Sequence, residues 1–239
     1  MTGTAHLTPT ELTTYQAAQA IARSVLEAIR ADIRPGATER QLLERCRQLM
    51  DAGGATDYWW FGVPALVLAG PRLRDSMEGD VYVAAATPVG MNDMVTIDLA
   101  PEINGFWGDC ARSYFLKNGA LVSAAEAGLE QAEGVAAESR LHAYVQSIAH
   151  PDMLFCELHT QVEGLMRTLD FENLDFLGNF GHSIGRDLHA RAFIDANCRK
   201  RLAEVPLFTF EPHIAKPGSA FAFKYEEIYR FVGDRLELL

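Results

Sequence analysis

The sequence predicts a single α+β domain that spans residues 1–239, with helical and β segments alternating along the chain. The chain has 239 residues, of which 49% are hydrophobic, and this is enough for one sizeable core. A pair of helical segments is followed by a β hairpin, and the same order returns in the second half. This order suggests two halves of similar plan, although no residue-level repeat supports a duplication.

Helices are expected at residues 8–33, 38–54, 123–149 and 155–169, where apolar residues recur at helical spacing. Thr8 or Thr10 can cap the first helix, and Pro35-Gly36 follows its end. Thr38 followed by Glu39 starts the second. We interpret the first two helices as structural cover.

The β segments are expected at residues 58–70, 94–100, 106–116, 205–212, 220–224 and 227–232. Residues 101–105 connect the second and third segments as a hairpin. Residues 72–88 form an acidic, turn-rich loop, and Pro217-Gly218 and Gly233-Asp234 mark turns.

Charge and composition exclude several classes of function. The formal net charge is −11, from 32 acidic against 21 basic residues, which opposes binding to nucleic acid or to anionic membranes. No apolar stretch approaches the roughly 18–20 residues of a membrane span, and the N-terminus has no signal-peptide pattern. We therefore expect a cytoplasmic protein. Its cysteines form no C-x-x-C pair and are expected to be reduced thiols: Cys46, Cys110, Cys156 and Cys198.

Four acidic residues lie in or beside apolar β segments. Asp98 is inside the apolar segment 95–100, and Asp109 lies in the next segment, so a hairpin can bring both carboxylates to one side of a sheet. Glu211 follows the apolar residues 207–210, and Glu226 lies close to the apolar residues 221–223. A buried carboxylate costs several kcal/mol unless a cation or hydrogen-bond donors compensate it.

If the four acids converge, metal ions would neutralise their repulsion. His182 lies in the glycine-flanked segment 178–185 and supplies a nitrogen ligand. Asp98 and Asp109 alone would be unspecific, because a buried Asp bonded to backbone N–H groups is as common.

The contexts of these five residues resemble the ligand motifs of the pita-bread metallopeptidases, the family of methionine aminopeptidase, aminopeptidase P, prolidase and creatinase. Asp98 stands in a D-[LF]-[GA] context, and Asp109 follows eleven residues later in G-[YF]-x-[SG]-D. His182 matches G-H-[GS]-I-G, Glu211 matches F-T-x-E-P, and Glu226 matches x-[IY]-E-[DE]. Residues 33–39 resemble the turn I-x-P-G-x-[ST]-E, so the resemblance covers nearly the whole chain.

The resemblance implies a pita-bread fold, with a curved antiparallel sheet covered by two helix pairs in pseudo-twofold halves. It also implies two divalent metal ions (Mn²⁺, Co²⁺, Fe²⁺ or Zn²⁺) held by Asp98, Asp109, His182, Glu211 and Glu226. In this family a hydroxide shared by both ions attacks an amide carbonyl. Glu211 would take and pass on the proton, and His189 would steady the substrate carbonyl or carboxylate, unless it is a surface loop histidine. The separate N-terminal domain of prolidase is expected to be absent, and a homodimer stays open.

Several positions depart from the family pattern. The family's histidine in the loop after the Gly-Pro turn falls at about Met77, and a thioether cannot donate a proton. Ala111 removes a hydroxyl of D-x-T-R, and Ala190 replaces a Glu. His213 replaces a Gly and either supplies the missing imidazole or is a partly exposed turn residue. The expected activity is therefore reduced or altered.

The leading hypothesis is a metal-dependent hydrolase of small peptides, similar to Xaa-Pro dipeptidases and aminopeptidases. An aromatic wall of residues 59–61 would suit proline or another apolar ring, although these residues equally suit the core or a dimer contact. A second hypothesis is a creatinase-like hydrolase of a non-peptide C–N bond in a small-molecule amide. A third is a binding protein that keeps the fold without turnover.

Overall fold

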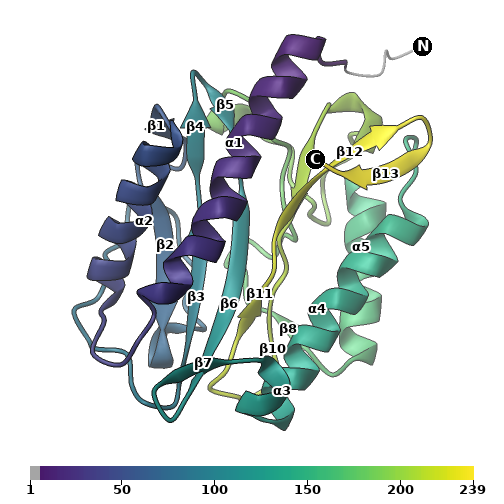
Figure 1. Cartoon of the computed structure of the whole chain (residues 1–239). Helices are drawn as coiled ribbons and strands as arrows, with labels where there is room; N and C mark the ends of the chain where they lie inside the picture. Colours follow the sequence, from purple (N-terminus) through teal and green to yellow (C-terminus); the bar gives the residue numbers. More distant parts are fainter. Residues whose placement is uncertain (1–5) are drawn as a thin grey trace.

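The computed structural model describes residues 6–239, and the helices and β-strands alternate along this part of the chain (Figure 1). The α-helices are α1 (Pro9–Ala28), α2 (Glu39–Gly53), α3 (Ala124–Ala127), α4 (Leu129–Ile148) and α5 (Phe155–Thr168). Short 3₁₀ helices are η1 (Ile29–Ala31), η2 (Gly70–Arg72), η3 (Leu188–Ala190) and η4 (Leu202–Glu204).

The strands pair only in antiparallel fashion among the described residues. In the first half they are β1 (Asp57–Tyr58), β2 (Ala65–Ala69), β3 (Asp93–Leu99), β4 (Pro101–Ile103), β5 (Phe106–Trp107), β6 (Cys110–Lys117) and β7 (Ala120–Val122). In the second half they are β8 (Glu172–Asn173), β9 (Phe208–Phe210), β10 (His213–Ala215), β11 (Phe223–Lys224), β12 (Glu227–Val232) and β13 (Arg235–Leu238). Neighbouring strands follow the orders β2-β3-β6-β7, β1-β4-β5, β13-β12-β9 and β11-β10-β8.

The helix starts agree with the sequence. Thr8, rather than Thr10, caps α1 through a capping box in which the Thr8 hydroxyl accepts from the Glu11 N–H. Thr38 caps α2 in the same way. The predicted helix over 123–149 is wrong in one respect, because Gly128 separates α3 from α4.

Two predicted β segments are divided in the structure, and a third is shortened. Residues 58–70 divide into β1 and β2 around a turn, and residues 106–116 divide into β5 and β6 at Gly108 and Asp109. A Cβ at Gly108 would lie 2.6 Å from the Ala18 carbonyl oxygen, so no side chain fits where this break in the strands lies against α1. Residues 205–212 contain only β9, which ends before Pro212, a residue without an N–H for a ladder.

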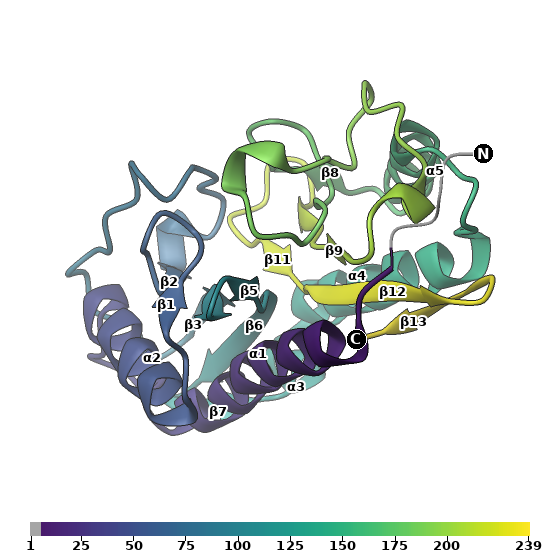
Figure 2. The same cartoon turned by 90° about the horizontal axis from the view of Figure 1, so that it is seen from above.

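Each helix pair packs on its own strands. Helices α1 and α2 enclose one cluster with β2, β3 and β6, which includes Ile21, Leu42 and Ile97. Helices α4 and α5 enclose a second cluster with β9, β10 and β11, which includes Leu141 and Phe208. Viewed from above, α1 and α2 lie on one side of the strands, and the loops around β8 and β9 lie on the other (Figure 2). This arrangement confirms the α+β class and its two-part plan.

The two halves meet where β6 lies beside β11 and β12. The Glu226 N–H donates to the Ala111 carbonyl (3.1 Å), and the Arg112 guanidinium donates to the Glu226 carbonyl (2.9 Å). Arg112 and Arg23 both pair with the buried Glu227 carboxylate. These contacts hold the first and second halves in register beside the candidate site.

Among the described residues, none of the helices combines the length and apolar character that a membrane span requires. The four cysteines are free thiols, as the sequence predicts. Residues 1–5, on which the signal-peptide interpretation partly depends, lie outside the described residues.

Candidate metal centre

Asp98 is held by β3, which lies between β2 and β6. The pairing places Asp98 opposite Leu66 on one side and Ala111 on the other. Its neighbours Ile97 and Leu99 point into the core because successive side chains of a strand alternate between faces. The Asp98 carboxylate therefore points to the opposite face, into a cavity of about 90 Å³.

Asp109 lies at the bend between β5 and β6, and its side chain is buried. Its backbone is fixed by Gln19 of α1, whose amide donates to the Asp109 carbonyl and accepts from the Asp109 N–H, both at 2.8 Å. The Asp109 Oδ2 atom is buried without a hydrogen-bond partner among the described residues. Burial, followed by the charges of Asp98 and Glu211, raises the pKa of Asp109 well above its usual value.

His182 presents a lone pair to the same cavity. Its Nδ1–H donates to the Ser183 carbonyl (3.1 Å), so the neutral ring has its lone pair on Nε2. Nε2 lies 3.6 Å from Asp109 Oδ2 and 3.5 Å from Glu211 Oε1. Burial lowers the pKa of His182 to about 4, which keeps the imidazole neutral and suited to bind a metal.

Gly181 allows the chain to place His182 there. Its φ of 140° is a conformation that residues with a side chain rarely adopt. A Cβ at this position would lie 2.2 Å from the Thr209 carbonyl oxygen in β9. The Thr209 N–H donates to the His182 carbonyl (2.8 Å), so the loop and the strand are tied together.

Glu211 and Glu226 come from the second half. The Glu211 N–H donates to the Phe180 carbonyl (2.9 Å), which fixes its position after β9. Glu226 is fully buried between β11 and β12, where its Oε1 accepts from the Thr209 hydroxyl (2.7 Å). Its Oε2 atom has no hydrogen-bond partner in the described part of the chain. Burial and the neighbouring charges of Asp109 and Asp98 raise the pKa of Glu226 well above its usual value.

The five residues converge as a group. Asp98, Asp109, His182 and Glu211 line the cavity, and ligand atoms of Asp98, Glu211 and Glu226 lie within 4.8 Å of one another. Carboxylate oxygens and one imidazole nitrogen form a donor set typical of Mn²⁺, Fe²⁺, Co²⁺ or Zn²⁺. The two buried carboxylate oxygens without partners fit a cation at this point.

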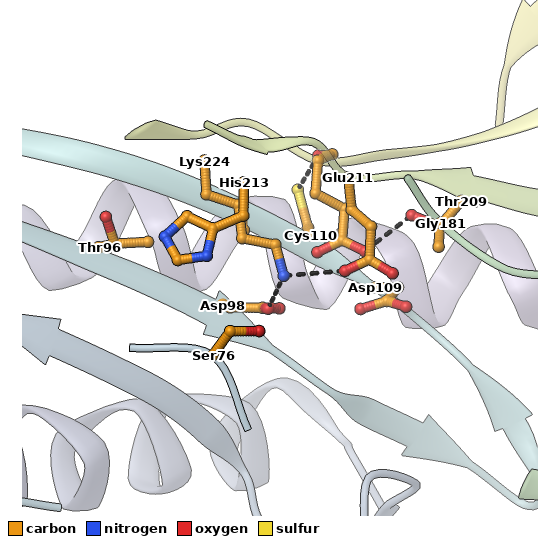
Figure 3. Close-up of polar contacts among 12 residues, drawn as sticks. Ser76, Thr96, Asp98, Asp109, Cys110, Gly181, Thr209, Glu211, His213 and Lys224 are labelled. Atoms are coloured by element: carbon orange, nitrogen blue, oxygen red, sulfur yellow. Dashed lines mark hydrogen bonds and ion pairs between the residues drawn. The ribbon is translucent and has the colours of Figure 1, made fainter. Parts of the chain in front are cut away.

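Lys224 is a central residue of the site that the sequence interpretation missed. Its ammonium lies between two of the carboxylates, 2.5 Å from Asp98 Oδ2 and 2.8 Å from Glu211 Oε2 (Figure 3). Burial opposes its charge, but Asp98 and Glu211 outweigh burial and raise the pKa of Lys224 well above its usual value. Burial raises the pKa of Glu211, but Lys224 and His182 outweigh it and lower that pKa. The signal in the sequence was a lysine directly after the apolar residues 221–223.

The other predicted site residues are placed differently. Met77 lines the cavity, whereas His189 is exposed on η3 and is absent from the cavity wall. The arrangement gives the substrate role of His189 no support, and that role stays a prediction. Arg191, two residues later, lines the cavity instead and packs over Trp59 and Phe193.

His213 is a buried residue of β10, so its interpretation as a partly exposed turn residue is wrong. Its ring lies beside Lys224 in the cavity (Figure 3). Nε2–H donates to the Leu73 carbonyl (2.8 Å), and burial followed by Lys224 lowers the pKa of His213 to about 4. The neutral ring therefore has only an acceptor left at Nδ1 and has no proton to donate to a substrate.

Two of the three predicted wall residues line the cavity, namely Trp59 and Trp60. Trp59 is also a core residue, because it stacks on Trp107 at 4.7 Å and its Nε1–H donates to the Gly108 carbonyl (2.9 Å). Phe61 is exposed and lies outside the cavity lining.

The fold and the clustered ligands define the class of the protein. Residues 13–232 match the model of metallopeptidase family M24, and the chain belongs to this family. Its enzymes depend on divalent metal ions. A comparison with curated proteins finds no match.

Solved structures with the same fold include peptidases of several kinds. Prolidase from Pyrococcus furiosus is 20% identical, with a TM-score of 0.77 over 97% of this chain and 64% of the prolidase. X-Pro aminopeptidase from Thermotoga maritima is 20% identical, with a TM-score of 0.76 over 97% of this chain and 61% of that chain. This chain therefore spans less than two thirds of either. Methionine aminopeptidase from Rickettsia prowazekii is 16% identical, with a TM-score of 0.73 over 99% of both chains. At these identities the likeness shows the pita-bread fold.

Proposed function

We propose that this protein is a metal-dependent hydrolase of small peptides, similar to Xaa-Pro dipeptidases and aminopeptidases. The observation that carries the proposal is the convergence of Asp98, Asp109, Glu211 and the neutral His182 at one cavity, with a ligand atom of Glu226 within 4.8 Å of those of Asp98 and Glu211. Buried oxygens of Asp109 and Glu226 are left without partners among the described residues. Membership of metallopeptidase family M24 supports the reaction class.

The ligands proposed for the metal are Asp98, Asp109, His182, Glu211 and Glu226. A divalent ion bound there would lower the pKa of water and polarise an amide carbonyl. Glu211 is the residue proposed to accept and pass on a proton, because its carboxylate lies in the cavity and has a lowered pKa. A carboxylate that is ionised at neutral pH can act as a base.

The cavity wall supports a substrate with an apolar group. Trp59, Trp60 and Phe193 face the cavity, and aromatic surfaces bind apolar rings through area burial and ring contacts. The partly buried Arg191 guanidinium adds one cationic group to this wall. A small peptide with an apolar residue next to the scissile amide fits this combination.

The test is a panel of dipeptides, Xaa-Pro dipeptides and short N-terminal amides with Mn²⁺ or Co²⁺. We expect cleavage in the wild type and its loss in Asp109→Asn, because the substitution removes a charged ligand. Asp187→Asn, on the exposed turn before η3, is the matched control and should keep activity. A wild type that binds metal but cleaves no member of the panel would reject the proposal.

A second candidate, a hydrolase of a non-peptide C–N bond, is favoured by Met77. This thioether lines the cavity where family members carry a histidine, so the chemistry at the leaving nitrogen differs. Depletion of a metabolite from an extract, dependent on Glu226, would support this candidate. A protein with no affinity for Mn²⁺, Fe²⁺, Co²⁺ or Zn²⁺ would instead favour a binding role.

The remaining expectations stay predictions. They are a single domain over residues 1–239, a cytoplasmic location, no binding to nucleic acid or membranes, and a homodimer.

A further inference from the structure

The five proposed ligands divide into two groups by the partners of their atoms. On one side, Asp98 Oδ2 and Glu211 Oε2 both bind the Lys224 ammonium, at 2.5 and 2.8 Å. A cation already lies between these two carboxylates, and it belongs to the chain itself (Figure 3). The ammonium compensates part of the negative charge on this side of the cluster without a metal ion.

On the other side, the ligand atoms lack such a partner. Asp109 Oδ2 and Glu226 Oε2 are buried and make no hydrogen bond within residues 6–239. His182 Nε2 has a free lone pair and lies 3.6 Å from Asp109 Oδ2 and 3.5 Å from Glu211 Oε1. Buried polar atoms are nearly always satisfied, so these atoms indicate where a cation is needed.

The net charge of the site alone does not distinguish one divalent ion from two, because the Lys224 ammonium is present in both cases. Two divalent ions would by themselves neutralise four carboxylates, and the Lys224 ammonium would then be a surplus positive charge in a buried site. One divalent ion together with the ammonium leaves a single net negative charge. The position of the ammonium favours one ion, because a second ion bound by Asp98 would lie within a few ångströms of it, and like charges repel strongly where water is excluded.

Burial and a backbone hydrogen bond restrict the position of Lys224. Its side chain is only 11% exposed, and its backbone N–H donates to the Ser113 hydroxyl (3.1 Å). An ion entering beside Asp98 would have to displace a tethered ammonium and leave it buried next to a divalent charge. Because the Lys224 ammonium is attached to the chain, it competes with a free metal ion at a high effective concentration. This favours its contacts with Asp98 and Glu211.

We propose that this centre binds one divalent ion, through Asp109, His182, Glu211 and Glu226, and that the Lys224 ammonium takes the place of a second ion between Asp98 and Glu211. The inference rests on the metal binding in the proposed function and departs from the two ions that the family resemblance implies. This narrows the ligand set of the proposed function from five residues to four, because Asp98 then positions Lys224 and does not bind the metal.

The test is metal content at saturation. The wild type, Lys224→Met and the control Lys216→Met are dialysed against Mn²⁺, and bound metal per chain is measured by mass spectrometry. Lys216 pairs with Glu133 at the surface, so its loss removes an ion pair without touching the cluster. We expect one ion per chain in the wild type and in Lys216→Met, and two in Lys224→Met.

Electron paramagnetic resonance gives a second readout that needs only the wild type, in case Lys224→Met does not fold. Bound Mn²⁺ should give the hyperfine pattern of an isolated ion in the wild type and in Lys224→Arg, which keeps the cation. Two ions or an exchange-coupled spectrum in the wild type would overturn the inference and leave the proposed function standing. A single ion in folded Lys224→Met would overturn it too, whereas no bound metal in the wild type would overturn both.

Discussion

The side-chain amide of Gln19 brackets the backbone of Asp109 like a strand partner. Gln19 Nε2 donates to the Asp109 carbonyl and Gln19 Oε1 accepts from the Asp109 N–H, each at 2.8 Å. Gln19 is fully buried on α1, and Asp109 lies at the bend where a strand ladder is interrupted. A residue of the first helix therefore completes the hydrogen bonding of a proposed metal ligand.

Gln19→Leu should destabilise the protein by about 2 to 5 kcal/mol, because each buried group left unsatisfied costs about 1–3 kcal/mol. The free energy of unfolding from urea titration measures this change. Metal affinity should fall about tenfold to a hundredfold, as for other groups that orient a ligand. Gln48→Leu, on an exposed face of α2, is the control and should stay within about 0.5 kcal/mol of the wild type. Equal losses in both variants would contradict the prediction.

Gly181→Ala should displace His182, because the new Cβ would lie 2.2 Å from the Thr209 carbonyl oxygen. The backbone has to move, and a proposed ligand tolerates only about 0.5 Å of displacement. We expect Mn²⁺ affinity, measured by calorimetry, to fall at least about tenfold. Gly185→Ala is a matched control, since no atom lies within 4 Å of its Cβ position. Unchanged affinity in Gly181→Ala would show that the loop adapts.

Met77→His should increase turnover of any amide that the wild type cleaves, because Met77 lines the cavity and a histidine there can donate a proton. A rise in kcat of about ten- to a hundredfold is expected, below the range for an optimally placed acid. Met77→Gln supplies a polar group of similar size without a titratable ring. If kcat rises equally in Met77→His and Met77→Gln, proton donation does not explain the increase.

Glu138→Gln should remove part of the pH dependence of stability. Glu138 is buried on α4, neither carboxylate oxygen has a hydrogen-bond partner in the described structure, and burial raises its pKa well above 4.5. The native state then binds more protons than the unfolded state, so the free energy of unfolding falls as pH rises above the unfolded pKa.

The measurement is the free energy of unfolding between about pH 5 and pH 9 with Mn²⁺ present, so that the ligand carboxylates stay charged. The decrease with pH should be smaller in Glu138→Gln than in the wild type. Glu27→Gln, whose side chain is 82% exposed, should keep the wild-type slope. Identical slopes in the wild type and Glu138→Gln would contradict the prediction. They would mean that the native state stabilises the ionised Glu138 carboxylate.

Much of the fold could be predicted because its signals are local. Capping residues such as Thr8 and Thr38 and the apolar spacing of the helices depend on neighbours a few positions away. The strand breaks could not be predicted in the same way. The break at Gly108 lies against the α1 backbone at Ala18, where a side chain would not fit, and these residues are distant in the chain.

The sequence by itself indicated the class of the protein through its resemblance to the family's ligand motifs. It also indicated a cluster of acids, because a carboxylate inside an apolar segment needs a cation or a donor wherever the chain places it. Asp98, Asp109, His182, Glu211 and Glu226 could therefore be named before their positions were known. Only the tertiary structure decided what else enters the cluster. It left His189 exposed and outside the cavity lining, and it placed Lys224 between Asp98 and Glu211. A lysine side chain is long enough to bind any carboxylate within its reach. Only the packing of the two halves determines which carboxylates those are.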